Sequence, residues 1–315
     1  MQQAGVSRAL LWSVRICIWM LLCTPLVVAP TWFFPYITGK NFFFRIVTEL
    51  TFGLWLALII VDARFRPKSG IVLWAFLAFI AVSGLATVFG ADPYHSFWSN
   101  YERMEGMVTY LHLAALFLMA SSVFRSIADW RLTFHLSLAI SLIVAGYGFL
   151  ELVGVVAAPG SKPGVTGIGI YSLLGNQIYL AAYLLSHFFI LGFLFFTLPP
   201  KKKVVSGNHT QTSMVGGFTT RRMWWRAAYA FLGLFELYIF FHTGTRGALI
   251  GFAAGLAVFV CALFLFSLRD NKRLAFYMGT VVAAGIVAAL GFFMLRESAF
   301  VARYLTAREE AALPA

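Results

Sequence analysis

The chain has 315 residues, of which 61% are apolar or aromatic and only 11% are charged. A soluble domain carries roughly 25% charged residues, so this sequence has too little polar material to coat a soluble fold. The net charge of +12 does not indicate nucleic-acid binding, because the basic residues lie in short runs between apolar stretches and form no stripe interleaved with aromatic residues. The composition predicts an all-α, polytopic membrane protein surrounded by the lipid bilayer.

Apolar stretches of spanning length recur along the whole chain. A helix that crosses a bilayer needs about 20 mainly apolar residues, and helices satisfy their own backbone hydrogen bonds in lipid. We expect about nine spanning helices, the first a retained helix and not a cleaved signal peptide. They lie near Leu10–Ala29, Phe42–Val61, Gly70–Phe89, Gly106–Phe124, Leu132–Ala157, Asn176–Leu198, Trp224–His242, Gly247–Leu268 and Leu274–Leu295.

The connections between these stretches alternate in charge. The richer set of basic residues is Arg8, Arg64, Arg66, Lys68, Arg125, Arg131, Lys201, Lys202, Lys203, Arg221, Arg222, Arg226, Arg269, Lys272 and Arg273. The poorer set is Lys40, Arg103, Lys162, Arg246, Arg296, Arg303 and Arg308. Since basic loops stay in the cytoplasm, we expect a cytoplasmic N-terminus and an extracytoplasmic C-terminal tail.

Ionisable residues inside the second span form the first candidate group. Arg45 and Glu49 are four residues apart, so they lie on one helix face and are expected to pair as a structural ion pair facing the bundle. His112, His135 and His187 lie in later spans and are expected to be packing residues whose polar atoms are satisfied.

The outer loop after the third span gathers acids, a cation and aromatic rings. Asp92, Pro93, His95, Trp98, Tyr101, Glu102, Arg103 and Glu105 follow one another closely there. Aromatic rings mixed with acids suit sugar binding, and they suit anchoring at the membrane interface equally well. Glu102 and Arg103 are therefore candidates for substrate binding, with the anchoring role left open.

Polar residues also open the sixth span. In the run from Gly175 to Ala181, Asn176 is placed to cap the helix and Tyr179 to sit in the interfacial aromatic belt,. The alternative is that both side chains form a polar wall of a substrate cavity. The sequence alone does not choose between these roles.

Two acids lie deeper in apolar sequence. Glu151 falls toward the outer end of the fifth span and Glu236 near the middle of the seventh. Ionisable residues inside a membrane are functional candidates by default. Glu236 has no evident partner in the sequence, so it either meets a cation from another helix or stays protonated in a low-dielectric site.

The turn between the seventh and eighth spans is the strongest local signal. It reads His242-Thr243-Gly244-Thr245-Arg246-Gly247, and the next helix is expected to begin near residues 246–248. A helix N-terminus presents free N–H groups and a positive dipole end, and an arginine adds a fork that matches phosphate oxygens. Gly244, Thr245 and Arg246 are thus candidates for holding a lipid-linked diphosphate. A tight turn with an arginine reaching to the interface is the structural alternative.

Three segments resemble the O-antigen ligase and O-antigen polymerase superfamily of membrane glycosyltransferases of the GT-C type. They are Phe97–His112 (FWSNYERMEGMVTYLH), Leu174–Leu185 (LGNQIYLAAYLL) and Thr243–Leu256 (TGTRGALIGFAAGL). The resemblance covers a core from residue 98 to 256 within a transmembrane domain of residues 1–295. It implies that the tail, residues 296–315, begins a periplasmic loop and that the C-terminal part of the protein is missing.

The resemblance also implies a function. Such enzymes transfer a glycan from undecaprenyl diphosphate to a lipid core, a polymer or a protein on the outer face of the bacterial cytoplasmic (inner) membrane. Arg246 matches the family's arginine that holds the diphosphate. No metal, nucleotide sugar or other cofactor is expected, and the sequence also lacks motifs for ATP or nicotinamide binding,. The catalytic residue and the acceptor stay unassigned.

A secondary transporter of a small solute or ion is the alternative. In that case Glu151, Glu236 and the Arg45–Glu49 pair would form a polar pathway across the membrane,. Transporters of this kind are built from inverted repeats with helices broken near the bilayer midplane. No glycine or proline breaks occur at matching positions of two halves, which disfavours this function.

Overall fold

The computed structural model describes residues 2–157, 169–196, 216–270 and 280. Within these ranges the regular elements are all helical, as the composition predicts. The α-helices are α1 (Gln2–Leu21), α2 (Thr38–Val61), α3 (Ile71–Val88), α4 (Pro93–Trp98), α5 (Met107–Val123), α6 (Ile127–Leu152), α7 (Gln177–Phe196), α8 (Gly216–His242) and α9 (Arg246–Asp270). Three short 3-10 helices join them: η1 (Thr24–Leu26), η2 (Ala63–Phe65) and η3 (Ser172–Leu174).

The chain divides into two compact units, Met1–Thr245 (the first unit) and Arg246–Ala315 (the second unit). Helices α1 to α8 belong to the first unit, and α9 opens the second. The single transmembrane domain expected over residues 1–295 stays a prediction. The ninth apolar stretch, except for Thr280, and the tail of residues 296–315 lie outside the described residues.

Five of the described helices are long and apolar enough to cross a membrane: α1, α2, α3, α6 and α7. Helix α5 and the segment Arg246–Ala262 of α9 are shorter apolar helices. The helix α3 shows the membrane character most clearly, because none of its residues is buried although its sequence is almost wholly apolar. Exposing these apolar side chains to water would be unfavourable in free energy, whereas contact with lipid chains is not.

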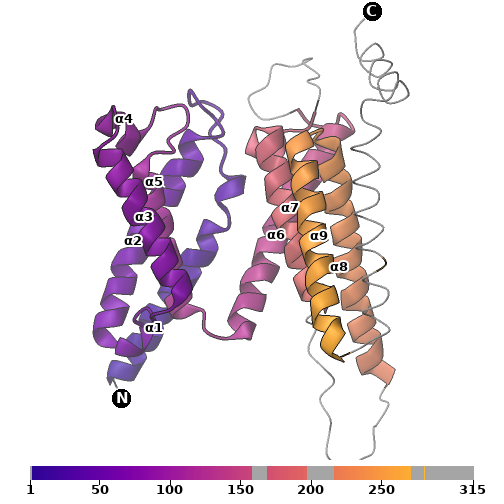
Figure 1. The fold of residues 1–315 in the computed structure, drawn as a ribbon, viewed down its shortest axis with the longest axis horizontal. Coiled ribbons are helices and arrows are strands. Elements are labelled where there is room, and N and C mark those ends of the chain that lie inside the picture. Colours follow the sequence, from indigo (N-terminus) through magenta and orange to yellow (C-terminus); the bar gives the residue numbers. More distant parts are fainter. Residues whose placement is uncertain (1, 158–168, 197–215, 271–279, 281–315) are drawn as a thin grey trace, which may run out of the picture. The chain divides into compact units, whose positions relative to one another are not determined.

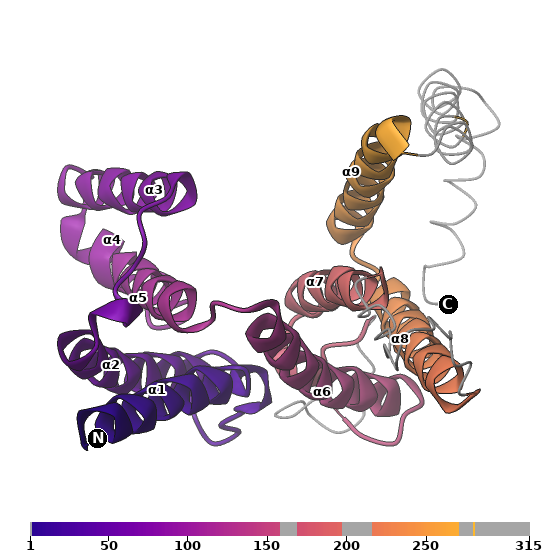
Figure 2. The same cartoon turned by 90° about the horizontal axis from the view of Figure 1, so that it is seen from below.

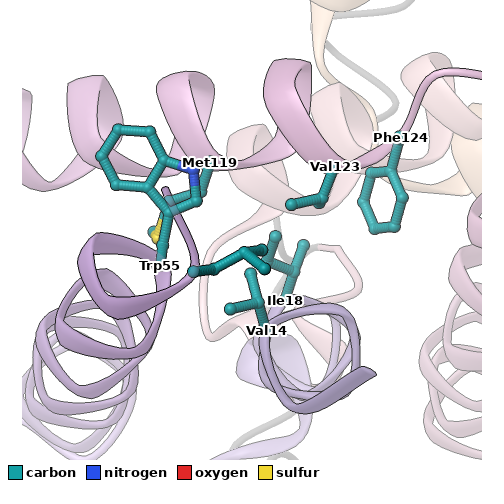
Figure 3. Packing of buried hydrophobic residues seen from close by; sticks show 7 residues of the cluster. Val14, Ile18, Trp55, Met119, Val123 and Phe124 are labelled. Atoms are coloured by element: carbon teal, nitrogen blue, oxygen red, sulfur yellow. The ribbon is translucent and has the colours of Figure 1, made fainter. Parts of the chain in front are cut away.

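Helices α1, α2 and α5 pack around one apolar core. Val14 and Ile18 of α1 meet Trp55 of α2 and Met119 and Val123 of α5 (Figure 3). Trp55 also donates a hydrogen bond of 2.7 Å from its ring nitrogen to Ser122 Oγ of α5. The indole N–H is thereby satisfied inside the core, as a buried polar group requires.

A second group of helices consists of α6, α7 and α8, which lie side by side (Figure 2). Leu138 of α6, Leu191 and Leu194 of α7 and Tyr229 of α8 form their buried apolar cluster. Helix α6 also contacts α1, through an ion pair of 3.1 Å between Arg15 Nη2 and Asp129 Oδ1. This ion pair ties α6 to the first group of helices.

The connections rich in basic residues meet at one end of the first unit. Ser7 of α1 donates a hydrogen bond of 2.7 Å to Asp62 after α2, and Arg125 after α5 donates to the carbonyl of Arg66 at 3.3 Å. Hydrogen bonds from Arg64 and then Ser7 hold the pKa of Asp62 well below its ordinary value. The start of α1, the end of α2 and the start of α6 thus share one end, as strict alternation of helix direction requires (Figure 1).

Helices α1 and α6 differ from the sequence prediction at their ends. The first helix ends at Leu21, not at Ala29, because the ring of Pro25 clashes with the carbonyl four residues earlier and ends the helix there. Helix α6 spans Ile127–Leu152 where Leu132–Ala157 was expected. Ser126 and Asp129 form a capping box that starts it early,.

Candidate functional site

The turn that the sequence singles out lies between α8 and α9. Helix α8 ends at His242, and Gly244 takes a left-handed conformation with a φ of 67°, which suits glycine because it has no side chain to clash. Thr243 is fully buried; its hydroxyl donates to the carbonyl of Phe240 at 2.7 Å and lies 2.7 Å from Thr245 Oγ1. Hydrogen bonds of the Thr243 hydroxyl thus fix the turn just before Arg246.

Arg246 is the first residue of α9, where the sequence predicts a helix to begin. Its side chain is exposed, and no hydrogen bond or ion pair joins its guanidinium to another residue of the described ranges. His242 Nδ1 binds the carbonyl of Tyr238 at 2.8 Å on its own helix. The border between the two units falls between Thr245 and Arg246.

The start of α7 confirms Asn176 as a helix cap. Its side-chain Oδ1 accepts a hydrogen bond of 2.8 Å from the backbone N–H of Ile178, which satisfies one of the free donors of the first turn. Tyr179 is about half exposed, at 47%. A contribution of these two residues to a substrate cavity stays a prediction.

Residues that the sequence did not bring together surround η3, just before Asn176; we call Tyr36, Lys40, Glu151 and Ser172 the η3 cluster. Lys40 Nζ donates to the carbonyl of Leu173 at 2.8 Å and lies 5.4 Å from the centre of the Tyr36 ring. The Glu151 carboxylate accepts from the backbone N–H groups of Tyr171 and Ser172, the latter at 2.7 Å. Burial, and then the Glu151 charge, raises the pKa of Tyr36.

The η3 cluster shows what the sequence reasoning missed. The sequence reasoning treated Lys40 only as a basic residue of a loop and Glu151 as a buried acid of a possible transport pathway. It did not consider Tyr36. Their meeting depends on contacts between residues more than 100 positions apart, such as Lys40 and Leu173. The glycine–asparagine pair at Gly175 and Asn176 was the local signal that a tight junction lies here.

The loop before α5 contains a short helix that was not predicted. Asp92 caps α4 by accepting a hydrogen bond of 2.9 Å from the N–H of His95, and Pro93 occupies the first helical position, which it favours. Beyond α4, the N–H of Arg103 donates to Asn100 Oδ1 at 2.8 Å. The side chains of Glu102 and Arg103 are exposed, so both are free to meet a ligand or an interface.

The expected ion pair between Arg45 and Glu49 is wrong. Arg45 Nη2 donates instead to the carbonyl of Met104 at 2.8 Å and to Thr109 Oγ1 at 3.0 Å. Glu49 lies 3.0 Å from His112 Nε2 on α5. The helix spacing allowed the pair, but the neighbouring helix α5 offers Thr109 to Arg45 and His112 to Glu49.

Glu236 is fully buried on α8, and its partner comes from α6. Ser141 donates a hydrogen bond to Glu236 Oε1, while Glu236 Oε2 has no hydrogen-bond partner among the described residues. No Lys or Arg of these ranges lies within ion-pair distance of it. The sequence left two environments open for Glu236, one beside a cation and one without a cation. The described residues provide the second.

The candidate residues fall into separate places within the first unit. Arg45 contacts the loop that carries Glu102 and Arg103, through the carbonyl of Met104. Asn176 caps α7, which begins shortly after η3. Among residues 2–157 and 169–196, no hydrogen bond, ion pair or ring contact joins Glu102 or Arg103 to Asn176 or Tyr179. The common outer cavity expected for these four residues stays a prediction.

Comparison with known proteins gives no relative to which these sites could be matched. No protein-family model, curated protein sequence or solved structure is similar to the chain. The all-helical fold and the apolar helices of spanning length rest on the structure itself. A function must therefore be argued from the residues described above.

Proposed function

We propose that the chain is an integral membrane glycosyltransferase of the O-antigen ligase type, which binds a glycan carried on undecaprenyl diphosphate. The observation that carries this proposal is the position of Arg246. It opens a helix of 25 residues directly after a glycine turn, and its exposed guanidinium has no partner in the described part of the chain. The segment Thr243–Leu256 that resembles the family contains this turn.

The chemistry of the turn suits a diphosphate. The first N–H groups of α9 have no partner within the helix and carry the positive end of its dipole. The guanidinium adds two parallel donors that match phosphate oxygens. When the glycan leaves its carrier, negative charge grows on the diphosphate, and a fixed cation beside it stabilises that charge.

The topology that goes with this function has about nine spans and a cytoplasmic N-terminus in a bacterial inner membrane. Support comes from the loops rich in basic residues, since those near Asp62 and Arg125 share one end of the first unit. The positive-inside rule assigns such an end to the cytoplasm. The turn at Arg246 would then face outward, where lipid-linked glycans are transferred.

Asn176, Tyr179, Glu102 and Arg103 are the residues that we propose for contact with the sugar or the carrier. Glu102, Arg103 and Tyr179 are exposed and Asn176 is half-buried, and acids, amides and aromatic rings are suited to sugar hydroxyls and ring faces. Gly244 and Thr245 would shape the diphosphate site beside Arg246. The glycan, the acceptor and the catalytic residue are not assigned.

Binding of undecaprenyl diphosphate to the purified chain in lipid nanodiscs tests this proposal. Arg246→Ala should weaken binding about tenfold or more, because a hydrogen bond between charged groups contributes roughly 1.5–3 kcal/mol. Arg246→Lys should keep part of the affinity, since a lysine offers charge without the fork. Arg8→Ala removes the same charge at an exposed arginine outside this turn and should leave binding unchanged. Equal affinity of the wild type and Arg246→Ala would remove the mechanism.

A further inference from the structure

Glu236 is a carboxyl group in an environment that does not favour its charge. It is fully buried on α8, one oxygen accepts from Ser141, and Oε2 has no hydrogen-bond partner among the described residues. A buried carboxylate without a cation is costly, and the cost grows where lipid surrounds the helices. A carboxylic acid in the same place has no charge to solvate.

In the described part of the chain, the groups that face Glu236 supply no compensating charge. Helix α8 packs against α6 and α7. From α7 the titratable group close to Glu236 is Tyr183, which itself lies beside Cys23, and from α6 it is the hydroxyl of Ser141. His187, one turn along α7, binds Ser137 at 2.8 Å, and His135 binds Tyr229 at 2.7 Å, so both rings are engaged elsewhere.

Helix α6 carries polar side chains toward Glu236 at every fourth residue. They are Asp129, Thr133, Ser137 and Ser141, and their partners from other helices are Arg15, Trp19, His187 and Glu236, in that order. Because a helix has 3.6 residues per turn, this spacing keeps all four on one slowly turning face. The face begins at Asp129, which is partly exposed next to the basic loops, and reaches Ser141 inside the bundle.

We propose that Glu236 is a proton-binding site, reached from the end of α6 near Asp129 along this polar face. In the step, one O–H bond of the carboxylic acid breaks, the carboxylate keeps the electron pair, and the proton passes to a water or hydroxyl on the face. The reverse step reloads the acid. Serine hydroxyls and a neutral imidazole suit such transfer, because each both donates and accepts. The inference does not depend on the proposed glycan transfer, because Arg246 takes no part in it.

Infrared spectroscopy of the purified chain in lipid tests the site, since a protonated carboxyl has a carbonyl stretching band that a carboxylate lacks. We expect a band at neutral pH that Glu236→Gln abolishes and that disappears as the pH rises. Glu49→Gln, the same exchange at an exposed glutamate, should leave this band in place. Absence of a Glu236-dependent band means an ionised carboxyl, and persistence of the band until the protein unfolds means a fixed structural acid. Either result overturns the proposal.

A pair of serine variants tests the proposed proton path along α6. Ser137→Ala should slow exchange of the Glu236 proton for deuterium several-fold, whereas Ser186→Ala should not, because Ser186 is an exposed serine of α7 bonded within its own helix. Equal exchange rates in the two variants would overturn the path. If Glu236→Gln does not fold, Ser141→Ala replaces it: loss of the donor to Oε1 should shift the band. An unshifted band belongs to another acid and contradicts the assignment.

Discussion

Three histidines inside the helices share one pattern of hydrogen bonds. In His112, His135 and His187, Nδ1 contacts the carbonyl four residues earlier, and Nε2 contacts a side chain on another helix. Those partners are Glu49, Tyr229 and Ser137. The sequence predicts these histidines to be satisfied packing residues, and the structure confirms it. The sequence alone could not identify the partners, because they depend on which helices become neighbours.

Gly175 provides a test at the level of one residue. Its φ is 69°, and a Cβ there would lie 2.1 Å from Tyr36 Cγ. Gly175→Ala should therefore lower the free energy of unfolding by roughly 1–3 kcal/mol through overpacking, with added backbone strain, as measured by denaturant or thermal unfolding in detergent.

Two further glycines separate the causes of this effect. Gly154 has a φ of 76° but open space around a Cβ, so Gly154→Ala measures strain alone. Gly146 lies within α6 with open space and no positive φ, so Gly146→Ala should be neutral or slightly stabilising. Equal stability of all three variants would contradict the close approach of Tyr36 to Gly175.

At the scale of elements, hydropathy located the helices well but not their ends. The expected spans near Phe42–Val61, Gly70–Phe89 and Gly106–Phe124 differ by four residues or fewer from the bounds of α2, α3 and α5. Helix α8 begins at Gly216, eight positions before the expected Trp224. Hydropathy reports where a chain can enter lipid, whereas a helix begins and ends where its caps and prolines place it.

The contact of α6 with α1 gives a prediction at this scale. Trp19 Nε1 donates to Thr133 Oγ1 at 3.0 Å, so a double-mutant cycle with Trp19→Phe and Thr133→Val should show favourable coupling. Interhelical hydrogen bonds of this kind average about 0.6 kcal/mol and reach about 1.7 kcal/mol. Unfolding of the four proteins in mixed micelles measures this coupling free energy. Additive single effects would show that this hydrogen bond does not stabilise the contact between α1 and α6.

The first unit as a whole has two chemically different ends. Contacts such as Ser7 with Asp62 join the loops rich in basic residues, while Lys40 with Leu173 joins loops of the other set. The prediction that helices alternate in direction agrees with both groups of contacts. Which end faces the cytoplasm depends on the charge rule and is part of the proposed function.

Labelling of single cysteines tests the orientation. In a variant without Cys17, Cys23 and Cys261, Ser96→Cys in α4 should react with a membrane-impermeant maleimide in intact cells. Ser69→Cys, between α2 and α3, should react only after the membrane is opened. Both positions are exposed, so the side of the membrane on which each cysteine lies decides whether it reacts with the maleimide. The reversed result would invert the orientation, and reaction of both from outside would contradict the alternation.

The sequence by itself determined the class of protein, most helices, the alternation of basic loops and the turn before Arg246, because hydropathy, charge and glycine act locally. Only the tertiary structure decided the partners of the polar residues. It gave Arg45 the carbonyl of Met104 in place of Glu49, gave Glu236 a serine in place of a cation, and assembled the η3 cluster. These pairings follow from which helix faces meet, and that depends on the packing of many side chains at once.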